Sequence, residues 1–344
     1  MQNPAGKPDS RETGILQRLR VSLRALQSST PHVLIACSGG KDSVALTWLL
    51  ADLRRLGLLN LSMAHIHHGQ HQQADQAANA IKEIGETLSI PTYVRRLEQA
   101  AIDAHTGVGL EEAMRRERYR VLAEIEHEVK ADAIALGHHR TDQAETMLLH
   151  LIRGTGLDGL AGMQEMEPRE IPWWGESDVT TNVLVWRPLL HESSTKIAEI
   201  AVSSRLPIVE DPTNVETRFR RNAIRHEVLT VLENISPGST QAIARSADVI
   251  RRDADLLHQI TEQTLMDARR NEMLDRSQLI VHPGALQLRV IRAWILGELP
   301  HLDLAEDRVR AVQVAVERNR GGSTIEIGGG ARVVLRDGML LLES

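Results

Sequence analysis

The feature that most constrains this chain is a short glycine-rich loop near its start. The loop, Ser38-Gly39-Gly40-Lys41-Asp42-Ser43, directly follows the apolar run from His32 to Cys37, and a second apolar run occupies residues 44–50. This pattern predicts a buried strand that leads into a helix beginning near Asp42. Adjacent glycines allow a tight turn in which successive backbone N–H groups point at one anion, and the helix dipole favours negative charge there.

The side chains of this loop suit a nucleotide. Ser38 and Ser43 supply hydroxyls, Lys41 a positive charge, and Asp42 a carboxylate of the kind that binds Mg²⁺. The Gly-x-x-x-x-Gly-Lys-Ser/Thr pattern of the Walker loop is absent. A plain strand-to-helix turn with a serine cap would explain one glycine and one serine, but not the whole set. We therefore predict a pyrophosphate cradle formed by Ser38, Gly39, Gly40, Lys41, Asp42 and Ser43.

Short apolar runs alternate with amphipathic stretches as far as residue 153. Further strands are expected at 61–66, 92–95 and 131–136, and helices at 73–88, 111–126 and 142–152. This alternation predicts an α/β fold with a doubly wound, mostly parallel sheet and a ligand at the carboxyl ends of its strands. Residues 154–191, rich in glycine and proline, are expected to be irregular, and helices are expected at 193–205 and 218–232.

The rest of the chain predicts a linker and a second domain. Ser236-Pro237-Gly238 interrupts the chain, apolar spacing predicts one long helix over 241–270, and Ser239 or Thr240 is expected to cap that helix. Helices at 283–299 and 304–318 and a small antiparallel sheet at 323–342 are expected beyond it. We expect four parts: an N-terminal lead-in and helix (1–29), a catalytic domain (30–235), a linker helix (236–274) and a small α+β domain (275–344).

Composition excludes several classes of protein. Among 344 residues no run of 18 apolar residues predicts a membrane span, and the polar stretch 1–13 has no secretory h-region, so we expect a cytoplasmic protein. A single cysteine, Cys37, excludes an intramolecular disulfide and a Cys-x-x-Cys site. The net charge of −6 argues mildly against nucleic acid, although only five of the 40 basic residues are lysines, and arginine suits phosphate and base edges.

A second group of polar residues comes after the strand expected at 131–136. Gly137-His138-His139 leads into a helix that Thr141 or Asp142 is expected to cap. Asp142 and Glu145, three residues apart, share the face that looks toward the strand ends, and His138 or His139 would stand beside them. Such a group would hold Mg²⁺, orient a phosphate or accept a proton from an amine. A capping aspartate with a charged first turn also explains the two acids, but not the paired histidines.

Three further segments carry weaker signals. The histidines of 65–71 invite a zinc interpretation, but without cysteine or His-Glu-x-x-His we favour a strand end that lines the nucleotide pocket, with the backbone near Ile66 against adenine. Arg115 and Tyr119 lie one helical turn apart, as do Arg221 and Arg225. Basic helices with an aromatic residue suit an unstacked RNA loop, whereas a solvated charged face is equally typical of them.

Together, these segments resemble the tRNA(Ile)-lysidine synthetase family of PP-loop ATP pyrophosphatases. The resemblance rests on seven ordered segments, which are residues 38–43, 65–69, 111–119, 138–146, 153–156, 187–189 and 210–225. The most specific are His138-His139-x-x-Asp142-Gln-x-Glu145-Thr and Glu-Asp-Pro-x-Asn, the latter leading to Arg221-Asn-x-x-Arg225. The resemblance implies a PP-loop fold, related to the adenine nucleotide alpha hydrolases, and a tRNA-modifying activity.

The implied reaction has two steps. ATP adenylates the C2 carbonyl oxygen of the wobble cytidine in a CAU-anticodon isoleucine tRNA, and the ε-amine of L-lysine then displaces AMP to give lysidine. The resemblance implies ATP and Mg²⁺ as cofactors, with Asp42 as metal ligand. It also implies catalytic candidates (Asp42, His138, Asp142 and Glu145) and residues that bind lysine or tRNA (Glu112, Arg115, Tyr119, Arg221 and Arg225).

The chain departs from the family pattern in two places and leaves several alternatives open. The stretch 167–183 carries Trp173 and Trp174, which would either stack on tRNA bases or plug the hydrophobic core. The sequence ends at Ser344, without the further C-terminal domain of longer members. tRNA thiolation, synthetase-like amidation and a catalytically inactive tRNA-binding protein are the alternatives, but the first needs cysteines that are absent. The oligomeric state is open, with a homodimer as one expectation.

Overall fold

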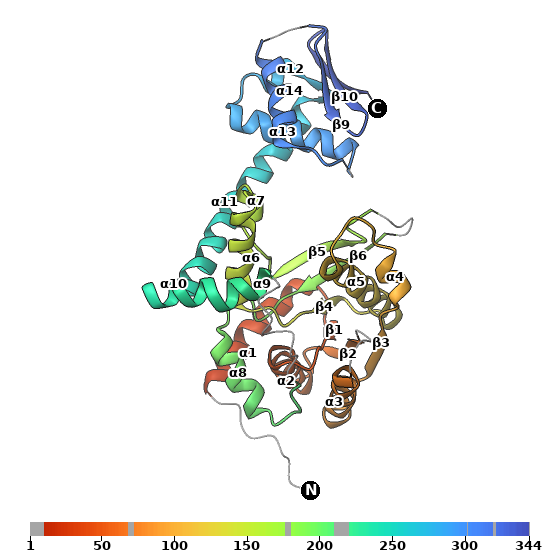
Figure 1. Cartoon of the computed structure of the whole chain (residues 1–344), viewed down its shortest axis with the longest axis vertical. Helices are drawn as coiled ribbons and strands as arrows, with labels where there is room; N and C mark the ends of the chain where they lie inside the picture. The colour runs from red at the N-terminus through yellow and green to blue at the C-terminus, as the bar shows by residue number, and fades with distance from the viewer. Residues whose placement is uncertain are drawn as a thin grey trace. The chain divides into compact units, whose positions relative to one another are not determined.

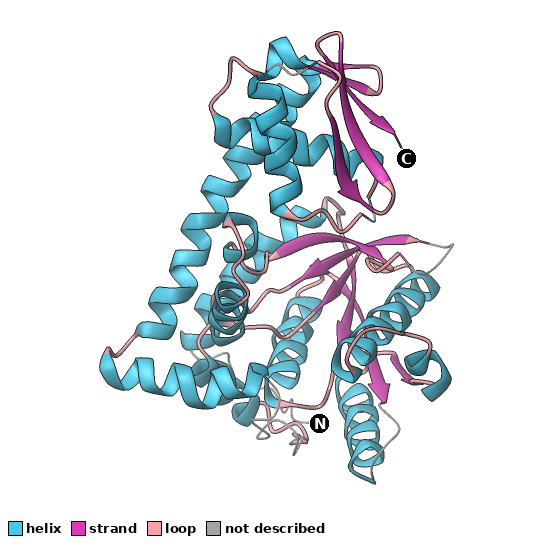
Figure 2. Cartoon of the chain, turned by 45° about the horizontal axis from the view of Figure 1, so that its top comes forward, coloured by secondary structure: helices cyan, strands magenta, loops and turns pink. Residues whose placement is uncertain are grey.

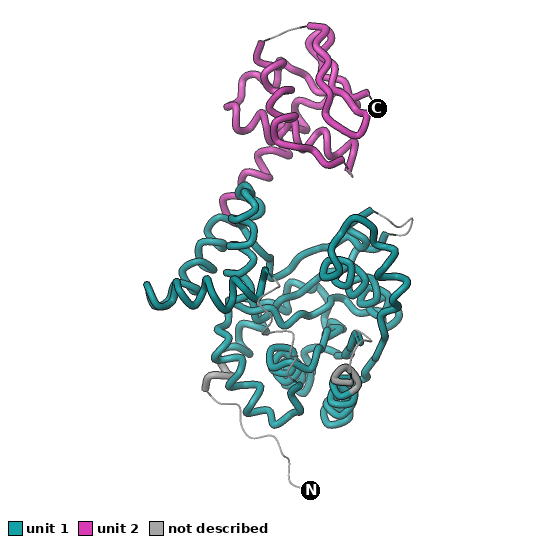
Figure 3. The backbone as a smooth tube through the Cα atoms, in the orientation of Figure 1, with its two compact units in different colours: residues 1–250 teal, residues 251–344 magenta. Residues whose placement is uncertain are grey.

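The computed structural model divides the chain into two compact units, residues 1–250 and 251–344 (Figure 3). It describes residues 10–67, 72–175, 180–209, 220–300, 302–318 and 321–343. The boundary between the units falls inside one helix, α11 (Ser239–Ala268), which is the long helix expected from the apolar spacing. The division of the chain into four parts at 29, 235 and 274 stays a prediction.

The first unit is built on a six-stranded sheet with the order β3-β2-β1-β4-β6-β5 (Figure 1). All neighbouring strands are parallel except β5, which runs antiparallel to β6. This confirms the predicted α/β fold with a mostly parallel sheet. The strands are β1 (His32–Ala36), β2 (Asn60–His67), β3 (Thr92–Arg96), β4 (Ala133–Ala135), β5 (Met166–Ile171) and β6 (Thr181–Trp186).

Helices cover both faces of this sheet (Figure 2). In β1, Val33 and Ile35 join the hydrophobic core on one face and Leu34 joins the other, because successive strand residues point to opposite sides. Helices α1, α2, α3 and α8 pack on the first face, and α4 and α5 on the second. The helices described before α11 are α1 (Ser10–Leu23), η1 (Arg24–Leu26), α2 (Lys41–Arg55), α3 (Gln72–Leu88), α4 (Gln99–Asp103), α5 (Leu110–Val129), α6 (Arg140–Ile152), α7 (Leu157–Leu160), α8 (Ser194–Ser203), α9 (Arg220–Ala223), η3 (Ile224–Val228) and α10 (Leu229–Ile235).

The prediction that residues 154–191 are irregular is wrong. This segment forms α7 and the antiparallel pair β5–β6, and β6 joins the sheet beside β4. Pro168 and the charged residues of β5 hide the strand pattern in the sequence. A proline is tolerated there because β5 is the edge strand of the sheet.

The expected cap of α11 is also wrong. The carboxylate of Glu233 accepts hydrogen bonds from the backbone N–H groups of Gly238 (2.7 Å) and Thr240 (2.8 Å). Ser239 instead donates its hydroxyl to the carbonyls of Leu232 and Ser236. The hydrogen bonds from Thr240 hold the pKa of Glu233 below its ordinary value. The cap was missed because it comes from the preceding helix, outside the local pattern.

The second unit is a small α+β structure with its own core. Its antiparallel sheet has the order β7-β8-β11-β10-β9, and buried side chains such as Trp294 and Val312 fill the space between sheet and helices. Its elements are β7 (Arg269–Arg270), β8 (Met273–Asp275), α12 (Arg276–Leu279), α13 (Gly284–Glu298), α14 (Glu306–Arg318), β9 (Thr324–Gly328), β10 (Ala331–Arg336) and β11 (Met339–Glu343). The three C-terminal strands and both long helices were expected. In the described part of the chain, no helix has the length and apolar character to cross a bilayer.

The buried face of α2 provides a test of this fold. Leu49 is 0% exposed in the core, whereas Leu56, just after the helix, is 55% exposed. Leu49→Ala should lower the free energy of unfolding by about 2–5 kcal/mol, because it leaves a cavity among packed neighbours. Leu56→Ala removes the same atoms and should change it by less than about 1 kcal/mol. Urea denaturation measures both, and equal effects would contradict the placement of α2.

Candidate active site

Two loops at the carboxyl edge of the parallel strands define the candidate site. The chain runs from β1 to β2 and β3 on one side, and β4 lies on the other side of β1. The strand order therefore reverses between β1 and β4, which is where open α/β sheets bind ligands. The loop after β1 is the predicted cradle, Ser38 to Ser43, and the loop after β4 carries His138 and His139.

The glycine-rich loop is held in shape by its own hydroxyls. Ser43 accepts a hydrogen bond from the N–H of Ser38 (3.2 Å) and donates one to the carbonyl of Gly40 (2.9 Å). Gly39 has φ +90°, a left-handed conformation that favours glycine. Helix α2 begins at Lys41, so its first N–H groups, which have no partner within a helix, belong to this loop. The loop therefore has the shape that the predicted anion cradle requires, and its binding of an anion stays a prediction.

The loop after β4 lies against the start of α2 at Gly137. A Cβ atom at this position would come within 3.1 Å of the backbone of Asp42 and of the nitrogen of Ser43. A larger residue would therefore push the two loops apart. Gly137 allows the two polar loops to share one site.

The start of α6 is capped by His139, so the expectation of Thr141 or Asp142 as the cap is wrong. The Nδ1 atom of His139 accepts the N–H of Thr141 (3.1 Å), and the Asp142 carboxylate accepts the N–H of His139 (2.8 Å). This is a reciprocal capping box in which a histidine ring takes the place of the usual hydroxyl. Asp142 keeps a role in the cap, but as the partner of the capping residue.

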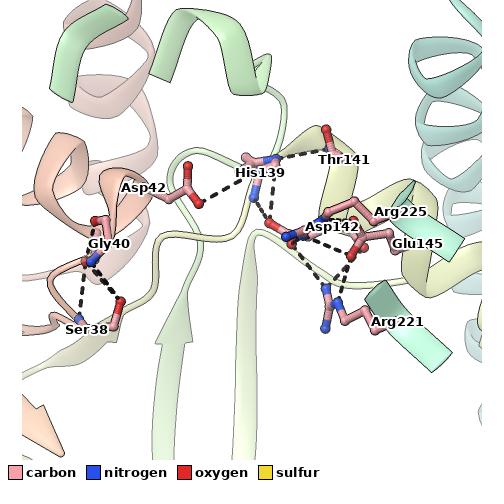
Figure 4. Close-up of polar contacts among 10 residues, drawn as sticks. Ser38, Gly40, Asp42, His139, Thr141, Asp142, Glu145, Arg221 and Arg225 are labelled. Atoms are coloured by element: carbon pink, nitrogen blue, oxygen red, sulfur yellow. Dashed lines mark hydrogen bonds and ion pairs between the residues drawn. The ribbon is translucent and has the colours of Figure 1, made fainter. Parts of the chain in front are cut away.

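Asp142 and Glu145 form an ion cluster with Arg221 and Arg225 (Figure 4). Nε of Arg221 lies 2.8 Å from Oε2 of Glu145, and Nη2 of Arg225 lies 2.8 Å from Oδ1 of Asp142. Glu145 is 0% exposed beneath the two guanidinium groups. Burial alone would raise the pKa of Asp142, but His139 and Arg221 outweigh it and lower the pKa to about 2. The acids expected to bind an amine are thus already paired with the arginines expected to bind RNA.

The arginines come from a helix with a changed hydrogen-bond pattern. Arg221 lies in α9 and Arg225 in the single π-helical turn Ile224–Val228, which α10 continues. Together these segments form the described part of the basic helix expected at 218–232. π-Helical turns are rare and are frequently found at functional sites.

Asp42 is the part of the site that suits a cation. Its Oδ2 lies 3.7 Å from Nε2 of His139, and its Oδ1 is buried with no hydrogen-bond partner among the described residues. Burial and the charge of Asp142 raise the pKa of Asp42, although the nearby His139 opposes them. No group of three or more His, Cys, Asp or Glu side chains in the described ranges is arranged for a metal. A magnesium ion at Asp42 would therefore take its other ligands from phosphate and water.

His138 is poorly suited to accept a proton. Burial lowers its pKa to about 3, and the positive charges of Arg221, Arg187 and Arg115 act in the same direction, opposed by Asp142. Its Nδ1 atom is buried and has no partner in the described part of the chain. The ring is therefore neutral at physiological pH and offers hydrogen bonds to a ligand more readily than it binds a proton.

Glu112, Arg115 and Tyr119 form a separate group on α5. The Arg115 guanidinium lies 5.6 Å from the centre of the Tyr119 ring, which is 4% exposed. Glu112 accepts a hydrogen bond from Nε of Arg116 at 3.3 Å. The link to the first group is electrostatic, since the charge of Arg115 lowers the pKa of His138. Because Tyr119 is buried, it supports Arg115 from below.

The contacts of Trp173 and Trp174 favour the prediction that they fill the hydrophobic core over the prediction that they stack on tRNA bases. Trp173 packs edge-on against Tyr119, with ring centres 5.1 Å apart, and Arg169 covers Trp173 at 4.9 Å. The guanidinium of Arg116 lies 5.7 Å from the Trp174 ring. Both tryptophans pack against the hydrophobic core beneath α5. Arginine side chains already stack on both tryptophan rings. The tryptophans are therefore better placed to support α5 than to stack on RNA bases.

The remaining predicted residues lie apart from the cluster or outside the described residues. Ile66, near the end of β2, is 8% exposed, and the adjacent His65 places Nδ1 2.9 Å from the carbonyl of Cys37. Residues 68–71 and 210–219, which include the Glu210–Asn214 turn and Phe219, lie outside the described residues. The sequence interpretation placed His138 or His139 beside the acids but missed His139 as the cap of α6 and Gly137 as the point of contact with α2. A glycine directly after a buried strand and before two histidines was the available signal.

The fold and the two loops define a nucleotide-binding α/β domain of the PP-loop class, and the comparisons agree. A family model described as PP-loop domain matches residues 14–232. A tRNA(Ile)-lysidine synthase from Synechococcus sp. is 32% identical over 276 residues, which cover 80% of each chain. One from Mycolicibacterium paratuberculosis is 33% identical over 341 residues, covering 96% of this chain and 97% of that one. The chain belongs to the tRNA(Ile)-lysidine synthase family of PP-loop enzymes, which confirms the resemblance seen in the sequence.

Other relatives are longer or more distant. The chain spans 56% of a tRNA(Ile)-lysidine synthase from Xanthomonas axonopodis, with 33% identity over 265 residues. The U34-tRNA thiolase NcsA from Methanococcus maripaludis superposes with a TM-score of 0.56 at 19% identity, over 70% of this chain and 80% of that one. The superposition on the thiolase shows that the two proteins share a fold.

The buried ion cluster should contribute strongly to stability. Glu145→Gln keeps the shape of the side chain but leaves two guanidinium groups without their anionic partner. We expect the free energy of unfolding to fall by about 2–4 kcal/mol, somewhat less than for a fully buried pair because the arginines are partly exposed. Glu227→Gln, on the exposed surface of the same helical segment, is the control and should have little effect. Urea denaturation that shows similar small losses for both would contradict the cluster.

The lowered pKa of His138 predicts a pH dependence of stability. Between its ordinary pKa of 6.5 and the folded-state value of about 3, the unfolded chain binds a proton that the folded chain does not. Stability must therefore fall as the pH drops through this window. His138→Gln cannot titrate, so its free energy of unfolding should fall less steeply between pH 7 and pH 4. Identical slopes for wild type and variant in urea denaturation would exclude a neutral His138 ring in the folded protein.

Proposed function

We propose that the protein ligates L-lysine to C2 of the wobble cytidine in CAU-anticodon tRNA(Ile), through an adenylated cytidine, with ATP converted to AMP and pyrophosphate. Family membership supports the tRNA substrate. The observation that carries the chemistry is the meeting of two loops at the β1–β4 switch point. One is the glycine-rich loop, which contains an Asp42 oxygen unpartnered among the described residues, and the other carries two acids beside a neutral histidine.

The first step requires a better leaving group on the cytidine. A carbonyl oxygen at C2 leaves poorly, and attachment of AMP makes it a good leaving group. In this proposal the backbone N–H groups at the start of α2, with the hydroxyl of Ser38 and the charge of Lys41, hold the pyrophosphate as negative charge develops on it. Asp42 fits Mg²⁺, which would supply further neutralisation of that charge. The backbone near Ile66 remains the proposed adenine contact.

The second step requires a positioned amine. Lysine arrives as an ammonium ion that suits an acidic pair, and it attacks C2 as a neutral amine after one of these carboxylates accepts its proton, with AMP as the leaving group. We assign the orientation of this amine to Asp142 and Glu145, with His138 as a neutral hydrogen-bond partner. Lysine would then displace Arg221 and Arg225 from the carboxylates, and this would free the guanidinium groups for phosphate or for the anticodon loop. Arg115, supported by Tyr119 and flanked by Glu112, is the remaining proposed RNA contact.

The chain offers little support for thiolation as an alternative. Its single cysteine, Cys37, is buried in the strand end, and burial raises the pKa of its thiol. A thiol in that state is a weak nucleophile and a poor sulfur carrier.

The proposal predicts lysine incorporation that depends on Asp42. Radiolabelled lysine, ATP, Mg²⁺ and unmodified CAU-anticodon tRNA(Ile) should give labelled tRNA with the wild type. Asp42→Asn should lower the rate at least about a hundredfold, because the pyrophosphate charge loses its neutralisation. Asp103→Asn, an exposed carboxylate on α4, should leave the rate unchanged.

The same assay separates the alternatives. Pyrophosphate release with tRNA but no lysine incorporation would keep adenylation and exclude lysine as the nucleophile. No ATP turnover under any combination, with tRNA binding retained, would identify an inactive tRNA-binding protein. Full activity of Asp42→Asn would exclude the assigned role of the cradle.

A further inference from the structure

We propose that His139 is a positioning residue for Asp42: its ring, fixed by the start of α6, orients the carboxylate that would bind Mg²⁺ at the start of α2. The inference deepens the proposed function and rests on it, since Asp42 needs orientation only if this loop binds Mg²⁺ and ATP. Sequence patterns placed His138 among the catalytic candidates. The contacts of the structure instead point to the next residue, His139.

The capping box fixes which nitrogen of His139 carries a proton. Nδ1 accepts the N–H of Thr141 at 3.1 Å, so this nitrogen must present a lone pair. In the neutral ring the proton then lies on Nε2. The backbone of His139 is held by Asp142, and the side chain is 4% exposed, so the ring has little freedom to turn. The helix cap thus sets the direction of the Nε2–H bond.

The Nε2 atom of His139 is near the carboxylate of Asp42. Nε2 lies 3.7 Å from Oδ2 of Asp42, which is longer than a hydrogen bond. Catalytic hydrogen bonds are often long without ligand and tighten when it binds. A donor on Oδ2 leaves Oδ1 to face a cation, and Oδ1 is the oxygen that is buried without a partner among the described residues. In this proposal Oδ2 of Asp42 accepts the hydrogen bond from His139, and Oδ1 binds the cation.

The backbone keeps the two helix starts at this distance. Gly137 lets the loop after β4 approach the backbone of Asp42, where a Cβ would come within 3.1 Å. His139 lies two residues later and is anchored to α6 through Asp142. In turn, Asp142 is held by Arg221 and Arg225. A connected set of contacts therefore runs from the ion cluster to the proposed metal ligand (Figure 4).

The alternative is that His139 acts as a helix cap alone, and two substitutions separate these roles. In His139→Asn, the amide oxygen takes the position of Nδ1 and remains a good cap, but no atom of the shorter side chain reaches Asp42. In His139→Gln, the longer side chain places an N–H donor near the position of Nε2, whereas glutamine is a poor cap. Each variant thus retains one function and loses the other.

The experiment titrates Mg²⁺ into the full-length protein with α,β-methylene-ATP, monitored by calorimetry, and measures thermal melting of the same samples. We expect His139→Asn to melt close to the wild type but to bind Mg²⁺ about three- to tenfold more weakly, as for loss of a typical hydrogen bond. His139→Gln should melt at a lower temperature and bind Mg²⁺ within about twofold of the wild type. Asp42→Asn serves as the reference for lost Mg²⁺ binding.

The outcomes are distinguishable. Mg²⁺ affinity that is unchanged in His139→Asn would overturn the proposal and leave a helix cap. Affinities that track the melting temperatures of both variants would overturn it as well, and so would a wild type that binds no Mg²⁺ with the analogue. Weaker Mg²⁺ binding in His139→Asn alone, in a protein that fails to incorporate lysine, would support the positioning role and refute the proposed ligation.

Discussion

The site depends on the close approach of the β4–α6 loop to the first turn of α2. At Gly137 this approach leaves no room for a side chain, since a Cβ would meet the backbone of Asp42 at 3.1 Å. The parallel sheet makes the approach inevitable in broad terms, because β1 and β4 are neighbours and their carboxyl ends lie at one edge. The glycine then brings the polar residues within reach of one another.

The second constraint is charge balance in a buried setting. Asp142 and Glu145 would be costly to bury as isolated anions, and Arg221 and Arg225 neutralise them. Asp42 is different, because Oδ2 of its carboxylate lies 3.7 Å from Nε2 of the His139 ring, and no guanidinium contacts it among the described side chains. Burial raises the pKa of Asp42, whereas its neighbours hold the pKa of Asp142 at about 2. The negative charge of Asp142 is thus already neutralised by its neighbours, whereas that of Asp42 is not. Of these two carboxylates, only Asp42 lacks a guanidinium contact within the described ranges.

Much of this arrangement could be predicted from the sequence, because it is encoded locally. The apolar run before Ser38 and the glycines after it specify a strand, a turn and a helix, and Asp142 and Glu145 share a helical face by spacing alone. Most of the errors concern contacts between distant segments, and the capping of α6 by a histidine ring is the local exception. The edge strand β5 contains Pro168 and is recognised through its pairing with β6, and Glu233 caps α11 from another helix. The pairing of Arg221 with Glu145 joins residues 76 positions apart, which no local pattern records.

The ion cluster also limits how the proposed reaction can proceed. The carboxylate oxygens of Glu145 are occupied by guanidinium donors, and its side chain is fully buried beneath them. An ammonium group and these guanidinium groups are therefore alternative partners for the same lone pairs. Under the proposed function, lysine binding and release of Arg221 and Arg225 are one event, and the freed arginines need a new anion. The ATP phosphates and the RNA backbone are the anions that the reaction itself supplies, so the affinity for lysine would be coupled to the presence of the other two substrates.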